Sequence, residues 1–219
     1  MAKTAVEKHF DKVASSYDSG KNKYSFYYSN LKKLLASLIE KNKCVFEFGS
    51  GTGDLLTSLN PKRGYGMDIS PQMIAIAKVR HKDNKNLVFS TQLPKVKFDY
   101  IFLSDVIEHL EKPENNFDEM ANLMKPKAKL ILTMANPTWE PLLMIWEKLG
   151  LKMKEGEHNR IKNHELRIML EKSGMKVIKH DYKLLIPIKI PLVTDLANRY
   201  LERYLKGLAF IEYFVVVKS

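Results

Sequence analysis

The segment EFGSGTGD, residues 47–54, begins inside the apolar run CVFEF, whose Glu47 is followed by three glycines and Asp54. A glycine turn at the end of a strand can bring backbone N–H groups close to a ligand. No Gly-Lys-Ser/Thr follows, which excludes a phosphate loop. The spacing also departs from the dinucleotide pattern G-x-G-x-x-G, because Asp54 or Leu56 occupies the place of the last glycine. Glu47 and Asp54 make the turn acidic, which favours a ligand with a cationic part.

A second carboxylate, Asp68, ends the next apolar segment, GYGMDI, roughly 20 residues beyond the first glycine. In α/β nucleoside sites a carboxylate at this position binds both ribose hydroxyls. The two carboxylates and the glycine turn therefore predict a nucleoside that carries a positive group and no phosphate. S-adenosylmethionine has this chemistry, since it joins adenosine to a sulfonium and an amino-acid ammonium.

Alternating apolar and amphipathic segments must position these side chains. Residues 1–40 have helical periodicity, with Leu31, Leu34, Leu35 and Leu38 on one face. Farther along, strand-like and helix-like segments alternate, which predicts an α/β fold with a parallel sheet covered on both faces. Ser70 is expected to cap the helix that begins at the following proline. The strand-like segments are CVFEF, GYGMDI, NLVFS, FDYIFLS, AKLILTMA, GMKVIKHDYKLLIPI and LAFIEYFVVVKS.

Composition narrows the class of protein. The chain has 219 residues, 45% of them hydrophobic, which predicts a single domain over residues 1–219. Its one cysteine, Cys44, excludes a disulfide framework and favours a reducing compartment. We expect a soluble, cytoplasmic protein, since neither a signal peptide nor a spanning segment is evident. The net charge of +11 and pI near 9.5 favour an anionic partner, but the lysines are spread over every segment, as on a solvated surface.

The chain resembles the class I S-adenosylmethionine-dependent methyltransferases, and within them the small-molecule branch of quinone-pathway and biotin-pathway enzymes. The segments that carry the resemblance are HFDKVASSYD, EFGSGTGD, GMDISPQMIAIAK and FDYIFLSDVIEHL. The resemblance implies a doubly wound, Rossmann-like methyltransferase fold, whose seven-stranded sheet is mostly parallel with an antiparallel last strand. It also implies S-adenosylmethionine as the cofactor and methyl transfer as the reaction.

Carried onto this sequence, the resemblance assigns the cofactor site residue by residue. The methionine part would lie against the turn, at Glu47, Gly49, Ser50 and Gly51, with Gly53 at a close helix–strand contact. Asp68 would hold the ribose, and Ile69 and Met73 would lie beside the adenine. Ser104 would approach the methionine part from the fourth strand, and Tyr17 would close over it. The family often has an acidic residue after the third strand, where this chain has Thr91 and Gln92, which could make a neutral contact with the adenine.

His109 is the candidate general base, because it follows the fourth strand at the edge where open α/β sheets bind ligands. Alternatively, His109 has a purely structural role. The remaining histidines do not have the spacing of metal ligands, so no metal is expected.

Two inserts, residues 136–165 and 185–208, are expected to form the acceptor pocket, and residues 1–40 are expected to form an N-terminal helical cap. They carry Trp139, Trp146 and Tyr200, and the second insert contains an amphipathic helix with basic flanks. This pattern favours a small or lipid-like acceptor, such as a quinone, a prenylated molecule or a carrier-bound group. It also allows peripheral contact with an anionic membrane or an acidic carrier.

Two other functions remain open on the sequence. A nucleic-acid methyltransferase would explain the basic pI, but the Asn/Asp-Pro-Pro-aromatic motif is absent after the fourth strand, which reads LSDVIEH, and NPTW follows the fifth. A non-catalytic cofactor-binding subunit would retain the glycine turn and Asp68. The sequence leaves the acceptor atom and the oligomeric state undetermined.

Overall fold

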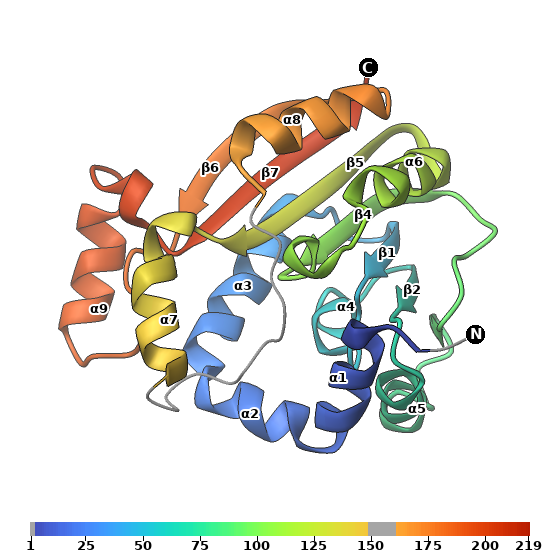
Figure 1. Ribbon diagram of the computed structural model, residues 1–219, viewed down its shortest axis with the longest axis horizontal. Helices are drawn as coiled ribbons and strands as arrows, with labels where there is room; N and C mark the ends of the chain where they lie inside the picture. Colours follow the sequence, from blue (N-terminus) through green and yellow to red (C-terminus); the bar gives the residue numbers. More distant parts are fainter. Residues whose placement is uncertain (1–2, 149–160) are drawn as a thin grey trace.

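The computed structural model describes residues 3–148 and 161–219 (Figure 1). In this part of the chain, seven strands form one sheet in the order β3-β2-β1-β4-β5-β7-β6. The strand β7 pairs antiparallel with both neighbours, and every other pairing is parallel. The predicted sheet with an antiparallel last strand is thus confirmed. The bounds are β1 Cys44–Phe48, β2 Arg63–Met67, β3 Leu87–Ser90, β4 Phe98–Ser104, β5 Met124–Ala135, β6 Met175–Lys183 and β7 Ile211–Lys218.

The strand order reverses between β1 and β4. From β1 the chain moves outward to β2 and β3, and it then returns to place β4 on the other side of β1. The crossovers on the two sides of this point diverge, which opens a crevice outside the carboxyl ends of the two strands. The glycine turn follows β1 and the segment with His109 follows β4, so the topology brings both to this crevice.

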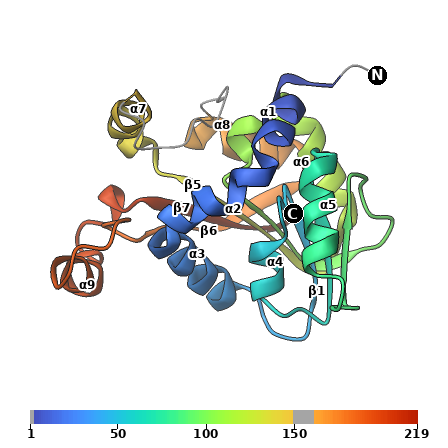
Figure 2. The same ribbon diagram turned by 90° about the horizontal axis from the view of Figure 1, so that it is seen from below.

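Helices cover both faces of the sheet, and Figure 2 shows α3 and α4 on the opposite side from α6 and α8. The core divides in the same way, because alternate strand residues face opposite sides. Phe46 and Ile101 pack under α6 and α8, whereas Val45 and Phe102 pack under α3, α4 and α5. The helices are α3 Ser25–Leu38, α4 Asp54–Ser58, α5 Pro71–Arg80, α6 Pro113–Leu123 and α8 Asn163–Lys172.

The helix α5 begins as the sequence predicts. The Ser70 hydroxyl accepts a hydrogen bond from the Met73 N–H, and Pro71 occupies the first turn, where its missing N–H costs nothing. This cap fixes the end of the loop that carries Asp68.

Two N-terminal helices, α1 Ala5–Val13 and α2 Tyr17–Lys23, are joined by a 3-10 turn at Ala14–Ser16 and lie near the carboxyl ends of β1 and β2 (Figures 1 and 2). Polar contacts tie them to the core. The Ser70 hydroxyl donates to Asp11 over 2.5 Å, and the Thr52 hydroxyl donates to Asp18 over 2.8 Å. Asp18 also pairs with Arg80. These contacts hold α1 and α2 over the crevice.

The helices α7 Glu140–Lys148 and α9 Val193–Leu196 lie beyond the end of the sheet where β5 and β6 end. A π-helical turn at Ala197–Leu201 follows α9, and single 3-10 turns occur at Ile107–His109, Pro137–Trp139 and Lys206–Leu208. Residues 149–160 of the first predicted insert lie outside the described residues. Among the described helices, none is long and apolar enough to cross a membrane.

The amphipathic segment after β6 turns apolar side chains to solvent, where the sequence predicts part of the acceptor pocket. We call this surface the exposed apolar face. Its side chains range from 41% exposed at Ile190 and Leu205 to 78% at Leu192. The face comprises Ile188, Ile190, Leu192, Val193, Leu196, Tyr200, Leu201, Tyr204, Leu205 and Leu208.

Candidate functional site

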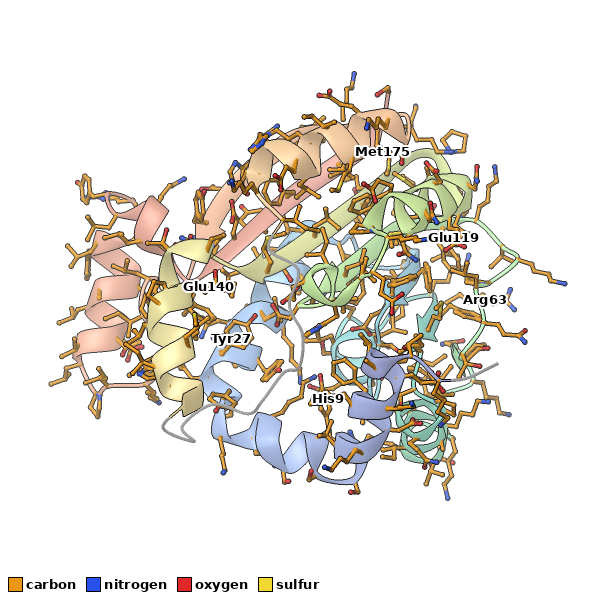
Figure 3. All side chains as sticks on the ribbon, viewed as in Figure 1. His9, Tyr27, Arg63, Glu119, Glu140 and Met175 are labelled. Carbon is orange, nitrogen blue, oxygen red and sulfur yellow. The ribbon has the colours of Figure 1, made fainter. Side chains whose placement is uncertain are left out.

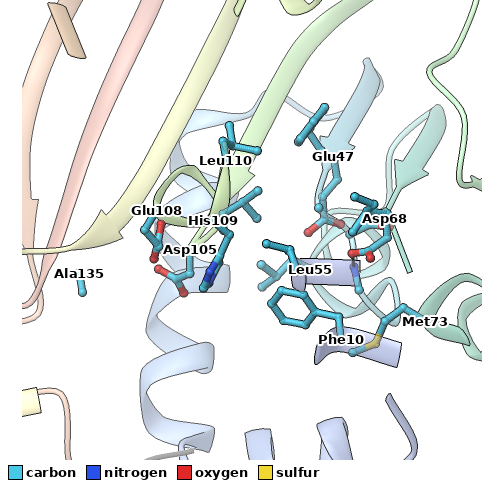
Figure 4. Close-up of a pocket in the computed structure, with 18 of the residues that line it drawn as sticks. Phe10, Glu47, Leu55, Asp68, Met73, Asp105, Glu108, His109, Leu110 and Ala135 are labelled. Atoms are coloured by element: carbon cyan, nitrogen blue, oxygen red, sulfur yellow. Dashed lines mark hydrogen bonds between the residues drawn. The ribbon is translucent and has the colours of Figure 1, made fainter. Parts of the chain in front are cut away.

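A cavity of about 560 Å³ occupies the crevice beside the point where the strand order reverses, between β1 and β4. Its residues come from the turn after β1, the ends of β2 and β4, the N-terminal helices and the segments around α7 and residue 187. His9 and Tyr27 line it at the carboxyl end of the parallel strands, whereas Arg63 and Met175 begin strands at the opposite end (Figure 3). Figure 4 shows two groups of polar side chains in the cavity, Glu47 with Asp68 and Asp105 with Glu108 and His109.

The glycine turn wraps tightly over the end of β2. The N–H groups of Gly49 and Ser50 donate to the Met67 carbonyl over 2.7 and 2.8 Å. Gly49 has φ of +78°, and a Cβ there would lie 2.4 Å from a methyl carbon of Val106. Only glycine fits this position without a shift of its neighbours. The result is a turn whose backbone lines the cavity at close range.

Asp68 fastens the turn to the start of α5. Its Oδ2 accepts a hydrogen bond from the Gly51 N–H over 2.7 Å, and its Oδ1 accepts one from the Ser70 N–H over 2.9 Å. The side chain is buried, and this burial raises the pKa of the carboxyl above its ordinary value. A carboxylate has about four acceptor positions. Asp68 therefore retains acceptor capacity for two hydroxyl groups in the cavity.

Glu47, at 2% exposure, lies beneath the same turn. Its Oε2 accepts a hydrogen bond from the Leu56 N–H over 3.1 Å. Burial raises the pKa of Glu47 to about 8, although the nearby Lys21 ammonium opposes this shift. A cation in the cavity would favour the ionised carboxylate and lower this pKa.

The second polar group stands at the end of β4. Asp105 has φ of +54°, and its two oxygens accept hydrogen bonds from the Tyr27 hydroxyl over 3.0 and 2.7 Å. Burial and the Asp105 charge raise the pKa of Tyr27 well above its ordinary value. The His109 ring lies edge-on to Phe10 of α1, with 5.4 Å between centroids. A titratable imidazole thus lies where α1 and the β4 end meet.

Most of the residues predicted for the site line this cavity. The turn contributes Glu47, Gly49, Ser50 and Gly51, the β2 end contributes Asp68 and Ile69, and Tyr17, Met73, Ser104, His109 and Trp146 line it as well. The Ser50 and Ser104 hydroxyl oxygens are buried without a hydrogen-bond partner among the described residues. Buried hydroxyls in this state fit a polar ligand.

The other predicted residues lie elsewhere. Gly53 packs against Phe89, where an added Cβ would come within 2.6 Å of the ring. Thr91 and Gln92 are exposed and line a separate small hollow beside α5. The Trp139 indole N–H donates to the Leu208 carbonyl over 2.7 Å, and Tyr200 is 51% exposed on the exposed apolar face.

The cavity residues that escaped the sequence reasoning include Lys21, Tyr27 and Asp105. For Lys21 a signal was available, because it follows Tyr17 by four residues, and such residues share one helix face. Tyr27 and Asp105 meet from segments 78 positions apart, so their contact depends on the tertiary fold.

Comparison with known proteins identifies the family. A sequence model of the methyltransferase domain matches residues 20–180. The chain belongs to this family. It is an S-adenosylmethionine-dependent methyltransferase, and S-adenosylmethionine is its cofactor.

Two curated relatives of this methyltransferase are named as O-methyltransferases. A malonyl-[acyl-carrier protein] O-methyltransferase from Marinomonas is 28% identical over 188 residues, covering 80% of this chain and 68% of the relative. A ubiquinone biosynthesis O-methyltransferase from Coxiella burnetii is 28% identical over 124 residues. That match spans about half of each protein, at 52% of both lengths.

Solved structures share the fold of this methyltransferase. An S-adenosylmethionine-dependent methyltransferase from Thermotoga maritima superposes with a TM-score of 0.72 at 20% identity, covering 98% of this chain and 100% of that one. A complex of a Haloferax volcanii methyltransferase with its Trm112 activator gives 0.70 at 20% identity, over 98% and 99% of the chains. Magnesium protoporphyrin IX methyltransferase from Synechocystis, with bound S-adenosylhomocysteine, gives 0.58 at 20% identity, over 90% and 83%.

Proposed function

We propose that this methyltransferase transfers a methyl group to a small or lipid-like acceptor, such as a quinone, a prenylated molecule or a carrier-bound group. The observation that carries the proposal is the continuity of the cavity. One cavity is lined both by the acidic glycine turn and by an apolar, aromatic half. Residues that line the apolar half are Tyr24, Tyr28, Leu143, Trp146, Pro187, Ile188 and Phe210.

The part of the cavity that the glycine turn and Asp68 line fits the cofactor chemically. Asp68 has acceptor capacity for two ribose hydroxyls, Ile69 and Met73 offer apolar contact to an adenine, and Glu47 supplies negative charge for the cationic methionine part. The buried Ser50 and Ser104 hydroxyls lack partners among the described residues, so they can bind polar atoms of the same group. When bound, the cofactor supplies an electrophilic methyl on a sulfonium. Tyr17 lies 3.3 Å from a Cβ position at Gly51, where it can cover that part of the site.

The chain's own contribution to the reaction is alignment and exclusion of water. Fixing the acceptor in line with the methyl can supply on the order of 7–11 kcal/mol of the barrier reduction. The helices α1 and α2 cover the site, with Phe10 beside His109. An acceptor that arrives protonated must also lose a proton, and we assign His109 as the base that accepts it.

The relatives support a quinone-like or a carrier-bound acceptor, because one is named as an O-methyltransferase of ubiquinone biosynthesis and the other as a malonyl-[acyl-carrier protein] O-methyltransferase. The exposed apolar face supports the lipid-like alternative, since one of its residues, Ile188, also lines the cavity and since Arg199 and Arg203 lie in the same segment. An apolar surface with basic flanks is typical of contact with anionic lipid or an acidic carrier. We include such peripheral contact in the proposal.

Methyl-labelled S-adenosylmethionine, incubated with the protein and extract of the source cells, tests the acceptor class. We expect label in the organic phase for a lipid or quinone, or on a small acidic protein for a carrier-bound group. Label in nuclease-sensitive material would overturn the proposal in favour of a nucleic-acid methyltransferase. Cofactor binding without any labelled product would favour the non-catalytic subunit.

Flotation with vesicles of anionic phospholipid tests the peripheral contact. Replacement of Leu192 and Tyr204 by serine should abolish co-flotation, because both side chains are more than 70% exposed on the face. Val79→Ser on α5 is the matched control, since Val79 is 73% exposed away from that face. Equal flotation of all three proteins, or none by the wild type, would contradict lipid contact.

A further inference from the structure

The lysines that are spread along the sequence gather at one end of the folded chain. This end lies opposite the cavity, where the parallel strands begin and β7 ends, and Figure 3 labels Arg63 and Met175 there. We name it the basic end. Because a strand rises about 3.3 Å per residue, the seven residues of β4 separate the basic end from the cavity by about 20 Å. The basic end comprises residues 40–44, 59–63, 83–87, 94–99, 124–129, 171–176 and 215–219.

Most of the net charge of the chain lies in these segments. They contain thirteen of the 36 lysines and arginines but four of the 25 acidic residues, which leaves 23 basic and 21 acidic residues for the rest of the sequence. Ten of the thirteen basic residues are exposed. Among the described residues, the ion pairs at this end join Lys43 to Glu40 and Lys125 to Asp99, so the ten exposed side chains have no carboxylate partner there.

Helix ends explain part of this charge. The C-terminus of a helix carries partial negative charge that a lysine offsets, and Lys41, Lys125 and Lys172 lie at or just beyond the ends of α3, α6 and α8. Lys95 and Lys97 lie instead in the loop from β3 to β4, a fully described loop that contains no helix. Both are exposed, and their like charges repel each other. An anion from outside the chain would offset this repulsion.

The charge at the basic end is arranged in a row. Neighbouring strands lie about 4.8 Å apart, so the ends of the seven strands form a row about 29 Å long. Each of the seven strand ends brings at least one basic residue to this row. A nucleic-acid duplex carries a phosphate about every 3.4 Å along each strand, so the row matches roughly eight base pairs. A row of cations of this length suits a linear polyanion.

The composition of the basic end favours a phosphate backbone over a protein or a membrane. Its basic residues are twelve lysines and one arginine, and Val96, at 49%, is the one exposed large apolar side chain in these described segments. Protein interfaces are depleted in lysine and enriched in aromatic residues. Binding to a lipid surface scales with buried apolar area as well as charge. The exposed apolar face, which could supply such area, lies at the opposite end of β6.

We propose that the basic end binds the phosphate backbone of a nucleic acid, in a contact that is separate from methyl transfer. Lysines that contact phosphates position a protein on a nucleic acid without reading its bases, so this binding is independent of sequence. The nucleic acid holds the enzyme in place, while the cavity at the other end of the sheet accepts its own substrate. This inference goes beyond the proposed function, which concerns the cavity alone.

Fluorescence anisotropy with a labelled DNA duplex of about 12 base pairs tests the inference. The wild type should bind it with a micromolar Kd at about 50 mM salt, and a duplex of scrambled sequence should bind equally. The logarithm of the binding constant should fall with the logarithm of the salt concentration with a slope of about −4 or steeper, because each phosphate contact contributes about −0.9. Lys62→Gln/Lys97→Gln/Lys176→Gln should weaken binding by roughly tenfold or more and make the slope shallower by about 2.7.

The matched control removes the same charge elsewhere. Lys8→Gln/Lys23→Gln/Lys33→Gln alters exposed lysines of α1, α2 and α3, outside both the basic end and the cavity lining. It should retain most of the affinity and of the salt slope. An equal loss in both triple variants would show that net charge alone controls binding, and it would overturn the basic end as a binding surface.

Two further measurements separate the basic end from the cavity and from lipid. The duplex should bind equally with and without S-adenosylhomocysteine, and it should receive no methyl group. Competition between the two ligands, or methylation of the duplex, would place the nucleic acid in the cavity and overturn the proposal. It is also overturned if the wild type does not bind the duplex but floats with anionic vesicles, and the triple variant of the basic end does not float.

Discussion

Replacement of Gly49 by alanine tests the construction of the glycine turn. At φ of +78° a residue with a Cβ costs about 1–2 kcal/mol. The added Cβ would also lie 2.4 Å from a methyl carbon of Val106, and overpacking of this kind typically costs about 1–3 kcal/mol. Gly49→Ala should therefore lower the free energy of unfolding by about 2–5 kcal/mol. Urea denaturation measures this change.

Gly174 provides the matched control, because its φ is +68° and a Cβ there would meet nothing within 4 Å. Gly174→Ala should show the backbone cost alone, about 1–2 kcal/mol. In the double variant Gly49→Ala/Val106→Ala the clash is removed, so the overpacking part of the lost free energy of unfolding should be regained. The double-mutant cycle should then give a coupling of about 1–3 kcal/mol. A coupling below about 0.5 kcal/mol would mean that the two sites act independently and would refute the reasoning.

Calorimetry with S-adenosylmethionine connects this cycle to function. A shifted turn should bind the cofactor more weakly, so Gly49→Ala should lose affinity and the double variant should regain part of it. Gly174→Ala should bind the cofactor as the wild type does, since Gly174 follows α8, away from the cavity residues. Loss of affinity in Gly174→Ala would show that general destabilisation, and not the turn, controls binding.

Three further predictions concern polar side chains of the cavity. Folded Glu47 retains its proton from its ordinary pKa of 4.5 up to about 8 while the unfolded chain ionises, so the free energy of unfolding should fall as pH rises through that window. Glu47→Gln should flatten this profile in urea titrations, and an unchanged slope would contradict the raised pKa. Asp68→Asn should weaken the binding of S-adenosylmethionine by about tenfold or more in calorimetry, because the NH2 group of the asparagine would face a backbone N–H donor. Full affinity would remove Asp68 from the site. His109→Ala should bind the cofactor normally but slow transfer to a phenol by roughly 100-fold. Transfer to a carboxylate should be unaffected, and an unaltered rate with the phenol would exclude His109 as base.

Much of the fold follows from local patterns. Val45 and Phe46 alternate between the two cores, as a strand buried on both faces requires. Ser70 and Pro71 specify the start of α5 through hydrogen bonding and a fixed φ, which act within a few residues. Patterns of this range are visible in the sequence, so the alternation of strands and helices could be predicted, whereas the antiparallel last strand was implied by the family resemblance.

The amphipathic segment after β6 was harder to interpret. Its periodicity predicts an apolar side, but periodicity does not say whether that side is covered. In the structure α9 ends at Leu196, a π-helical turn follows, and Tyr204 is 72% exposed. What covers an apolar face depends on the neighbouring elements, which the local pattern does not encode.

The candidate site divides in the same way. Glu47 and Asp68 were predictable because strand ends of a parallel sheet meet at one edge, whatever the rest of the chain does. The position of Thr91 and Gln92 depends on the path of the loop after β3, which leads them to a separate hollow beside α5. The spacing of Lys21 from Tyr17 predicts that the two share a helix face. That this face lines the cavity depends on how α2 lies over the sheet, which the spacing does not encode.

A crystal structure of the protein with S-adenosylhomocysteine tests the central claim most directly. We predict that the ribose hydroxyls bind Asp68, that the amino-acid part lies against Glu47 and the glycine turn, and that the sulfur faces the apolar half of the cavity. A cofactor bound outside this cavity, or one whose ribose makes no contact with Asp68, would contradict the account.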